Sequence, residues 1–447
     1  MKEKKLLLKI TLIEITICIF FHMIKSIKNS LYKKVIVVLL LFMNLGISQE
    51  SLYEINLNVN PDKNDYWWLN NNNQGKYANK NIIDLKWKMK NQSMEYQLIL
   101  SNGFAENQKF QIGESFIKGN IFKDVYIKLG KYYRDFSLYL NDNLSSGSML
   151  ISNNAEPMPK MGLIGKSQYN RNKNISFDWG ISHGKFDKNE YYSQSPFLHE
   201  KFLYMNFKKN DQKFSVGLVH EAVWAGTTTA GDHQGKQPGK IKDFFKVFIS
   251  ADGPLREGEV HANALGNHLG IWDFYYQKNK NKNQILKLYY QHFFEDTSSL
   301  RFANKTDGLW GIELKNYISN TNILLEYLDT SNCCVNPPYQ SDQYYYNYQY
   351  RAGWSYKNNI LGNPFVNPTG FRSGNVELSK IVHIGLTKNI DMNNLTIQAS
   401  RDTHISDNIK YKITFDREIN KIALINIFLV GNEDSHGFGL GGSYIIK

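Results

Sequence analysis

The chain has 447 residues, of which 42% are hydrophobic, 14% are aromatic and only 10 are proline. This length allows two or three average domains or one large all-β architecture, and the composition excludes collagen-like and proline-rich disordered chains. The formal net charge is +12, but the eight lysines and two glutamates of residues 1–48 account for half of it. The remaining excess is spread without a Lys/Arg block, which is typical of a solvated surface and predicts no nucleic-acid partner.

Residues 1–48 are predicted to be a targeting segment. The apolar run 35–45 follows two lysines and has the length of a signal-peptide core. Gly46-Ile47-Ser48 then supplies small residues for cleavage before Gln49. Export across the inner membrane is the expected consequence.

An earlier apolar run, residues 6–24, is interrupted by a lysine and a glutamate. We therefore interpret residues 1–22 as a mis-assigned start upstream of Met23, and the alternative is a genuine N-terminal anchor. After residue 48 no apolar stretch approaches the roughly 18–20 residues that a transmembrane helix needs. Any residence of residues 49–447 in a membrane must therefore use strands.

The cysteines indicate no metal site. Cys18 falls in the targeting segment, and the remaining two, Cys333 and Cys334, are adjacent. Neighbouring cysteines lack the spacing of a zinc site and close a strained ring only reluctantly. We expect two free or intermolecularly paired thiols in a loop.

From residue 52 onward the dominant hydrophobic period is two, as in strands with one apolar and one polar face. In residues 83–90 four apolar side chains alternate with Asp84 and three lysines, and residues 174–182, 394–400 and 409–416 repeat the pattern. Further strands are predicted near residues 94–100, 121–130, 201–208, 213–220, 269–277, 285–294, 308–317, 321–329, 376–388, 421–430 and 438–446. Allowing for strands that the pattern does not resolve, we estimate about sixteen to eighteen.

Alternation alone does not distinguish a soluble sandwich from a membrane barrel. A barrel is favoured by strands near the roughly 9–11 residues that cross a bilayer, by aromatic clusters near strand ends, and by the export signal. Residues 438–446 resemble the terminal strand that barrel-insertion machinery recognises, although Lys447 follows where an aromatic residue is typical. The prediction is an all-β fold, a transmembrane antiparallel β-barrel of residues 49–447 in the outer membrane.

Two stretches, residues 221–263 and 331–374, interrupt the strand rhythm and are predicted to be long plug or extracellular loops. The first contains a Gly- and Thr-rich tract, residues 224–239, that could fold inward as a plug. The second carries six tyrosines between residues 344 and 356, which we interpret as a contact surface.

Three stretches, in this order, resemble the Wzi capsule-assembly proteins of Gram-negative outer membranes, in the form common among Bacteroidetes. They are Gly217-Leu-Val-His-Glu-Ala-Val-Trp-Ala-Gly226, Thr306-Asp-Gly-Leu-Trp-Gly311, and Tyr350-Arg-Ala-Gly-Trp354 leading to Leu361-Gly-Asn-Pro364. The sequence has Ala225 where members of that family often have glycine. The resemblance implies a monomeric barrel of eighteen strands, blocked by inserted loops or helices, that holds capsular polysaccharide at the cell surface as a lectin.

Sugars are bound by aromatic faces that stack on C–H surfaces and by polar side chains that satisfy hydroxyls, with Arg or Lys added for acidic glycans. The two long loops contain these residue types. The candidate contact residues are Trp224, His233, Arg256, His261, Tyr348, Tyr350, Arg351 and Trp354. The expected partners are capsular or other surface polysaccharide, outer-membrane lipid and the barrel-insertion machinery.

Two other functions stay open. An open porin or nutrient channel would also have polar inward faces, and the state of the lumen distinguishes it from a plugged barrel. A hydrolase is the less favoured alternative, because His220 and Glu221 point to opposite faces of a regular strand and no nucleophile or metal motif is present. We expect no catalytic residue, no metal and no cofactor.

Overall fold

The structure is a computed structural model that describes residues 51–61, 66–76, 81–103, 111–231, 233–255, 262–295, 300–332, 344–366, 378–403, 409–420 and 422–446. The predicted targeting segment, residues 1–48, lies outside the described residues. Residues 52–447 form one compact unit.

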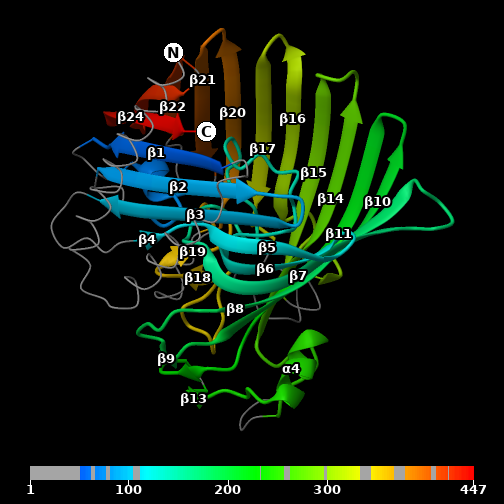
Figure 1. Ribbon diagram of the computed structural model, residues 1–447. Coiled ribbons are helices and arrows are strands. Elements are labelled where there is room, and N and C mark those ends of the chain that lie inside the picture. The colour runs from blue at the N-terminus through cyan, green and yellow to red at the C-terminus, as the bar shows by residue number, and fades with distance from the viewer. Residues whose placement is uncertain are drawn as a thin grey trace. The chain divides into compact units, whose positions relative to one another are not determined.

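The main feature of this unit is a single antiparallel sheet of nineteen strands, of which eighteen form the wall of a barrel and the two-residue β4 (Gln111–Ile112) adds to the edge of one of them (Figure 1). The wall strands are β1 (Ser51–Val59), β2 (Ile82–Lys90), β3 (Met94–Gly103), β5 (Ser115–Phe122), β6 (Val125–Tyr132), β7 (Met158–Gln168), β8 (Ile175–Lys185), β10 (Phe197–Lys209), β11 (Gln212–Trp224), β14 (Asn267–Asn279), β15 (Ile285–Phe294), β16 (Gly308–Ile318), β17 (Thr321–Asp329), β20 (Lys380–Ile390), β21 (Asn393–Asp402), β22 (Ile409–Ile419), β23 (Ala423–Gly431) and β24 (His436–Ile446).

The sheet closes on itself. Each wall strand pairs with its neighbour in the chain, and β1 pairs both with β2 and with β24, where Tyr53 lies opposite Ile446. Closure satisfies the backbone groups that an open edge would leave unpaired. The predicted all-β barrel of sixteen to eighteen strands is confirmed.

Alternation along each strand separates a lumen face from an outer face. On β10, Phe202 and Tyr204 are about 5–6% exposed, whereas the intervening Leu203 and the next residue, Met205, are 56% and 37% exposed. Large apolar side chains on the outer face are stable only against lipid or another apolar phase. The period-two pattern therefore produces an apolar outer band around a filled interior.

The two ends of the barrel differ in their connections. At one end, here called the short-turn end, consecutive strands are joined by tight turns in which Asn210, Asn320 and Asp391 have φ between 52° and 53°. Asn and Asp tolerate this left-handed conformation better than most residues, which is why they occupy such turns. At the other end, the long-loop end, residues 133–157, 225–266 and 330–379 connect strands.

The remaining elements are small. They are helices α3 (Trp67–Asn70) and α4 (Ile241–Phe248) and the short strands β9 (Tyr192–Gln194), β12 (Thr227–Thr228), β13 (Gly235–Lys236), β18 (Ser355–Tyr356) and β19 (Asn359–Ile360). Helix α3 lies between β1 and β2, β9 lies between β8 and β10, and the others belong to the connections 225–266 and 330–379. Among the described residues, no helix is both long and apolar enough to cross a membrane.

The strand predictions agree with the structure at most positions. The predicted ranges 285–294 and 321–329 coincide with β15 and β17, but the predicted range 121–130 spans the turn between β5 and β6. Strand β7 was not predicted, because apolar residues lie on both of its faces, such as the buried Ile164 on the lumen face and the 54% exposed Met161 on the outer face, and obscure the period of two.

The loop boundaries differ slightly from those predicted. Strand β11 continues to Trp224, so residues 221–224 are wall and not loop. The second connection runs from the end of β17 at Asp329 to the start of β20 at Lys380, close to the predicted 331–374.

Candidate functional site

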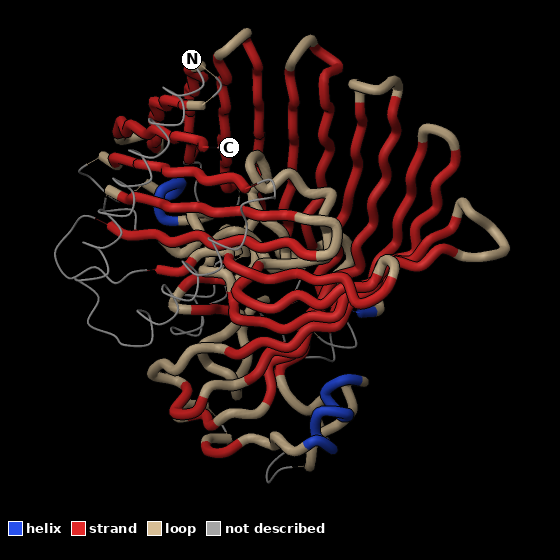
Figure 2. The backbone as a smooth tube through the Cα atoms, viewed as in Figure 1, coloured by secondary structure: helices blue, strands red, loops and turns tan. Residues whose placement is uncertain are grey.

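Residues 133–157, the connection between β6 and β7, are buried along most of their length, and we call them the first plug segment. Leu144, Met149 and Leu150 are at most 1% exposed, although the segment forms neither strand nor helix. Figure 2 shows tan loop segments gathered within the ring of red strands. Long connections normally run over the surface. Burial of this one indicates that it lies in the lumen.

Residues 344–366, within the connection between β17 and β20, form the second plug segment. The two plug segments are joined by hydrogen bonds between buried groups. The bonds are Ser152 Oγ to Gly362 O at 2.6 Å, Trp354 Nε1 to Leu150 O at 2.6 Å, Tyr345 OH to Met149 O at 2.5 Å and Asn363 Nδ2 to Gly147 O at 2.7 Å. Side chains of one segment thus satisfy backbone carbonyls of the other, as buried polar groups require.

The first plug segment is also attached to the barrel wall. Its partners are polar side chains on the lumen faces of four consecutive strands, β14 to β17. The bonds are Ser137 Oγ to Asp273 Oδ2 at 2.6 Å, Met149 N to Gln291 Oε1 at 2.9 Å, Asn141 Nδ2 to Glu313 Oε1 at 2.8 Å and Ser146 N to Glu326 Oε2 at 2.7 Å. Three of the four wall acceptors are carboxylates, which form the stronger hydrogen bonds.

Apolar packing joins the same parts. Leu144 and Trp354 of the plug belong to one buried cluster with Tyr275, Phe293 and Leu324 of the wall. Burial of a large apolar side chain contributes about 1.5–3 kcal/mol relative to exposure. Plug and wall therefore share one core.

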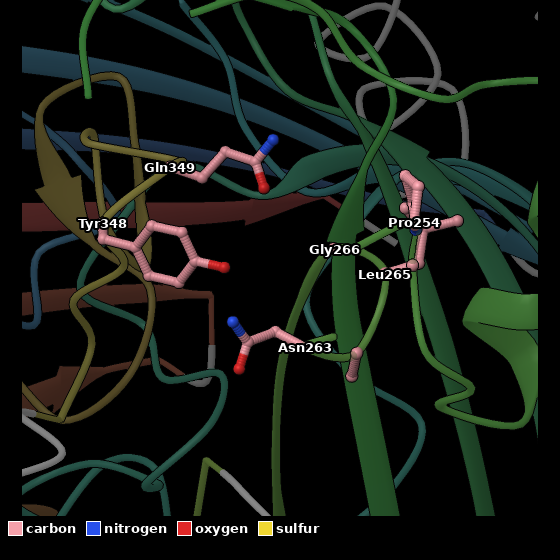
Figure 3. A pocket seen from close by; sticks show the side chains of 8 residues that line it. Pro254, Asn263, Leu265, Gly266, Tyr348 and Gln349 are labelled. Carbon is pink, nitrogen blue, oxygen red and sulfur yellow. The ribbon is translucent and has the colours of Figure 1, made fainter. Parts of the chain in front are cut away.

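At the long-loop end the two longest connections meet in a cleft (Figure 3). Its lining is Gly253, Pro254, Asn263, Ala264, Leu265 and Gly266 on one side and Tyr348 and Gln349 on the other. The cleft is a small hollow with a volume of about 10 Å³, far below the roughly 300–1,000 Å³ of pockets that enclose small ligands. It suits contact with part of a larger molecule better than enclosure of a small one.

Three of the predicted contact residues come together beside this cleft. His233 packs edge-on against Tyr348 with ring centroids 6.4 Å apart, and both are half-buried. Arg351 lies over the ring of Tyr346 at 5.1 Å and donates a hydrogen bond to its hydroxyl. The backbone of Gly231 lies so close to that of Tyr348 that a Cβ at position 231 would be 2.5 Å from the carbonyl oxygen of Tyr348.

Two other predicted contact residues lie inside the plug. Trp354 is fully buried, and the hydroxyl of Tyr350, a residue that is 1% exposed, donates to the carbonyl of Ala225 at 3.2 Å. Neither presents a surface to a ligand. Both instead join the second plug segment to its neighbours, and we remove them from the contact set.

Trp224 lies on the outer face of β11 and is 8% exposed. Its ring packs against Phe197 at 5.7 Å and against Phe244 of α4 at 5.8 Å. It therefore supports helix α4 and is not a contact residue. Arg256, His261, Cys333 and Cys334 lie outside the described residues.

The histidine and glutamate considered for catalysis face opposite sides of the wall. His220 Nε2 lies 2.9 Å from Nδ1 of His268 under helix α4. Glu221 is fully buried and lies opposite Glu200, the partner of Lys160 in the lumen. As expected for a regular strand, the side chains of His220 and Glu221 therefore point to opposite faces of the wall.

Asp307 connects the wall to the loop after β17. It lies just before β16, and its carboxylate accepts hydrogen bonds from the backbone N–H of Asn332 and from the hydroxyl of Tyr344, each at 2.9 Å. Burial raises the pKa of Asp307 to about 6, although these hydrogen bonds oppose the rise.

Sequence analysis missed the first plug segment altogether. The available signal was the tract Leu144-Ser-Ser-Gly-Ser-Met149, which has no strand period and lies between the predicted strands 121–130 and 174–182. The acceptors Asp273, Gln291 and Glu326 resemble any polar lumen residue in sequence, so no local pattern could have identified them.

A family model described as capsule assembly protein Wzi matches residues 58–369, which is more than half of the chain. The matched range includes both plug segments and the cleft. Comparison with curated proteins gives no match.

Several solved structures of bacterial proteins align along most of the chain at very low identity. OpdL of Pseudomonas aeruginosa is 6% identical over 89% of this chain and 99% of its own, with a TM-score of 0.45. OccK5 (OpdH) of the same species is 7% identical over 89% and 97%, with a TM-score of 0.46, and OccAB4 of Acinetobacter baumannii is 9% identical over 89% and 99%, with a TM-score of 0.44. The barrel assignment rests on the strand pairings of this chain.

Proposed function

We propose that this chain, which belongs to the Wzi family of capsule assembly proteins, binds capsular polysaccharide at the cell surface. It retains the polysaccharide there and does not pass it through the barrel. The protein is an outer-membrane β-barrel. In such barrels short turns face the periplasm and long loops face the outside. The long-loop end, with its cleft, then faces the capsule.

The observation that carries this proposal is the plug. Two segments distant in sequence fill the barrel below the cleft, and they are attached to the wall and to each other by buried hydrogen bonds. Such an interior supports binding at the outer end over passage through the lumen.

The residues at the outer end have the chemistry that a glycan contact needs. Tyr348 offers an aromatic face, the exposed Asn263 lines the same cleft with an amide, and Arg351 lies close by with a guanidinium. Aromatic faces stack on sugar rings, and a guanidinium can pair with a carboxylate of an acidic polysaccharide. We therefore infer binding without catalysis, by a monomeric barrel.

The direct test is binding of the purified, detergent-solubilised protein to immobilised surface polysaccharide from its own host. Saturable binding is expected, and the polysaccharide should keep its length after prolonged incubation. Shortening of the chains would indicate a hydrolase, and no binding at any concentration would contradict the proposal.

An open channel is the alternative function, and polar side chains on the lumen face near the short-turn end favour it. Asn206, for example, bonds Asp178 at 3.0 Å and Ser215 at 2.6 Å. The same polar groups would also be needed in a plugged barrel, to contact water in the part of the lumen near the short-turn end. Planar-bilayer recording distinguishes the two, because large steady single-channel currents are expected only of an open channel.

A further inference from the structure

Helix α4 lies on the outer side of the barrel wall, at the long-loop end. Phe244 packs against His183 at 5.1 Å, His199 at 5.4 Å and Trp224 at 5.8 Å. These three residues project outward from β8, β10 and β11. Figure 1 shows α4 beside the lower ends of the green strands, away from the lumen.

The wall under the helix is polar, unlike the outer face of β10 nearer the short-turn end. His199 is fully buried, and His220 and His268 bond each other and Ser250, which follows the helix. Farther along β10, beyond Lys201 and toward the short-turn end, the outer face continues as Leu203, Met205 and Phe207. Helix α4 thus covers a patch of histidines at the border of the lipid-facing band nearest the long-loop end.

A second face of α4 is apolar and has no cover among the described residues. Ile241, Phe245 and Ile249 are 80%, 64% and 71% exposed, and their spacing of four residues places them in one row. Leu255, beyond the helix, is 62% exposed. Exposed apolar rows of this size mark contacts with another apolar phase.

Basic residues flank this row. Lys240, Lys242 and Lys246 are exposed, and Lys246 donates to the carbonyl of Asp252 at 2.9 Å. The helix has a single acidic residue, Asp243, which is buried and accepts a hydrogen bond from the backbone N–H of Lys240 at 2.8 Å. The exposed part of the helix therefore combines an apolar row with exposed lysines.

We propose that α4 is an interfacial helix that inserts Ile241, Phe245 and Ile249 into the outer leaflet and places its lysines against anionic lipid headgroups. Two observations support a lipid surface as the occupant: the row lies beside the lipid-facing band of β10, and the flanking charge is positive. Amphipathic helices with an apolar face and flanking lysines generally lie in the interface plane. The anionic groups of that leaflet supply the complementary charge. This inference rests on the membrane location and does not depend on glycan binding.

The test uses nitroxide labels on the full chain, with its three cysteines replaced by serine, in lipid bilayers. One label replaces Phe245, an aqueous control replaces the exposed Lys188, and a lipid-facing control replaces Leu203. The label at position 245 should show high collision with oxygen and low collision with a water-soluble nickel complex, as at position 203 and unlike position 188. Nickel accessibility equal to that at position 188 would overturn the proposal.

Two further experiments test whether a second copy of the chain covers the row and whether the lysines hold the helix at the bilayer. Spin–spin broadening at position 245 would show that a second copy covers the row, and this also overturns the proposal. Lys242→Gln with Lys246→Gln should raise nickel accessibility at position 245 in bilayers containing phosphatidylglycerol, whereas Lys282→Gln at the short-turn end should not. If the label at position 245 prevents folding, as judged by gel mobility of the unheated barrel, the label is moved to Ile249.

Discussion

The carboxylate of Glu326 accepts a 2.7 Å hydrogen bond from the backbone N–H of Ser146, a residue 180 positions earlier in the chain. The same carboxylate accepts the hydroxyl of Ser145 at 2.6 Å and that of Tyr289. One wall residue thus binds the plug at two adjacent positions. A single substitution at Glu326 can therefore weaken the attachment of the plug to the wall.

Glu326→Ala should loosen the plug. Removing the carboxylate leaves two buried donors of the plug unsatisfied, at a cost of about 1–3 kcal/mol each. In planar bilayers the variant should show brief openings that the parent protein lacks, and it should unfold at lower denaturant concentration. Glu418→Ala, an exposed acid near the short-turn end, is the control. Equal current traces for all three proteins would refute the role given to Glu326.

Tyr348 and Arg351 should contribute directly to affinity for the host polysaccharide. Loss of one aromatic stacking contact is worth about 0.5–1.5 kcal/mol, which corresponds to up to about tenfold in Kd. Tyr348→Ala should therefore weaken binding, Tyr348→Phe should retain it, and Arg351→Gln should weaken binding mainly to acidic glycans. Unchanged affinity in both Tyr348→Ala and Arg351→Gln would place the contact surface elsewhere.

Stability should depend on pH through Asp307. Because burial raises the pKa of this carboxyl to about 6, the folded state binds its proton more tightly than the unfolded state does. Its contribution to stability is therefore fully present below about pH 4 and is lost as pH rises through about 6, by an amount on the order of 2–3 kcal/mol. Denaturant unfolding between pH 4 and 8 should show this fall in the parent protein and a smaller fall in Asp307→Asn. Parallel pH profiles would exclude Asp307 as the source.

Ala225 and Gly226 should differ in their response to exchange. Ala225 has φ of 59°, where alanine costs about 1 kcal/mol relative to glycine, but its methyl group is buried and worth about 0.8 kcal/mol. Ala225→Gly should thus change the unfolding free energy by less than about 1 kcal/mol. Gly226→Ala should destabilise, because φ is 77° and the new Cβ would lie 2.8 Å from the carbonyl oxygen of Gln194. A strongly destabilising Ala225→Gly would show that the methyl contact outweighs the strain.

Much of the barrel could be predicted because its determinants are local. Period-two alternation reports which face of a strand meets lipid, so β15 and β17 were predicted to the residue. Strand β7 was missed because its lumen face carries the buried apolar side chains Met158 and Ile164, so that apolar residues fall on both faces. The period of two is lost where the filled lumen takes apolar side chains.

The site was less predictable than the wall. Residue type suggested aromatic contacts at Trp224, Tyr350 and Trp354, but stacking on a sugar and packing in a core use the same rings. Only tertiary structure shows that Trp354 is fully buried whereas Tyr348 lines the cleft. The plug was missed for a related reason, because Ser145 and Ser146 acquire their role only through Glu326 on a distant strand.

The central claim is that this barrel retains polysaccharide at the outer surface. The measurement that tests it most directly compares cell-attached with released capsular polysaccharide in the host after deletion of the gene. The account predicts that total production is unchanged while the attached fraction falls and the released fraction rises, with recovery when the parent gene is restored. An unchanged attached fraction in the deletion strain would contradict it.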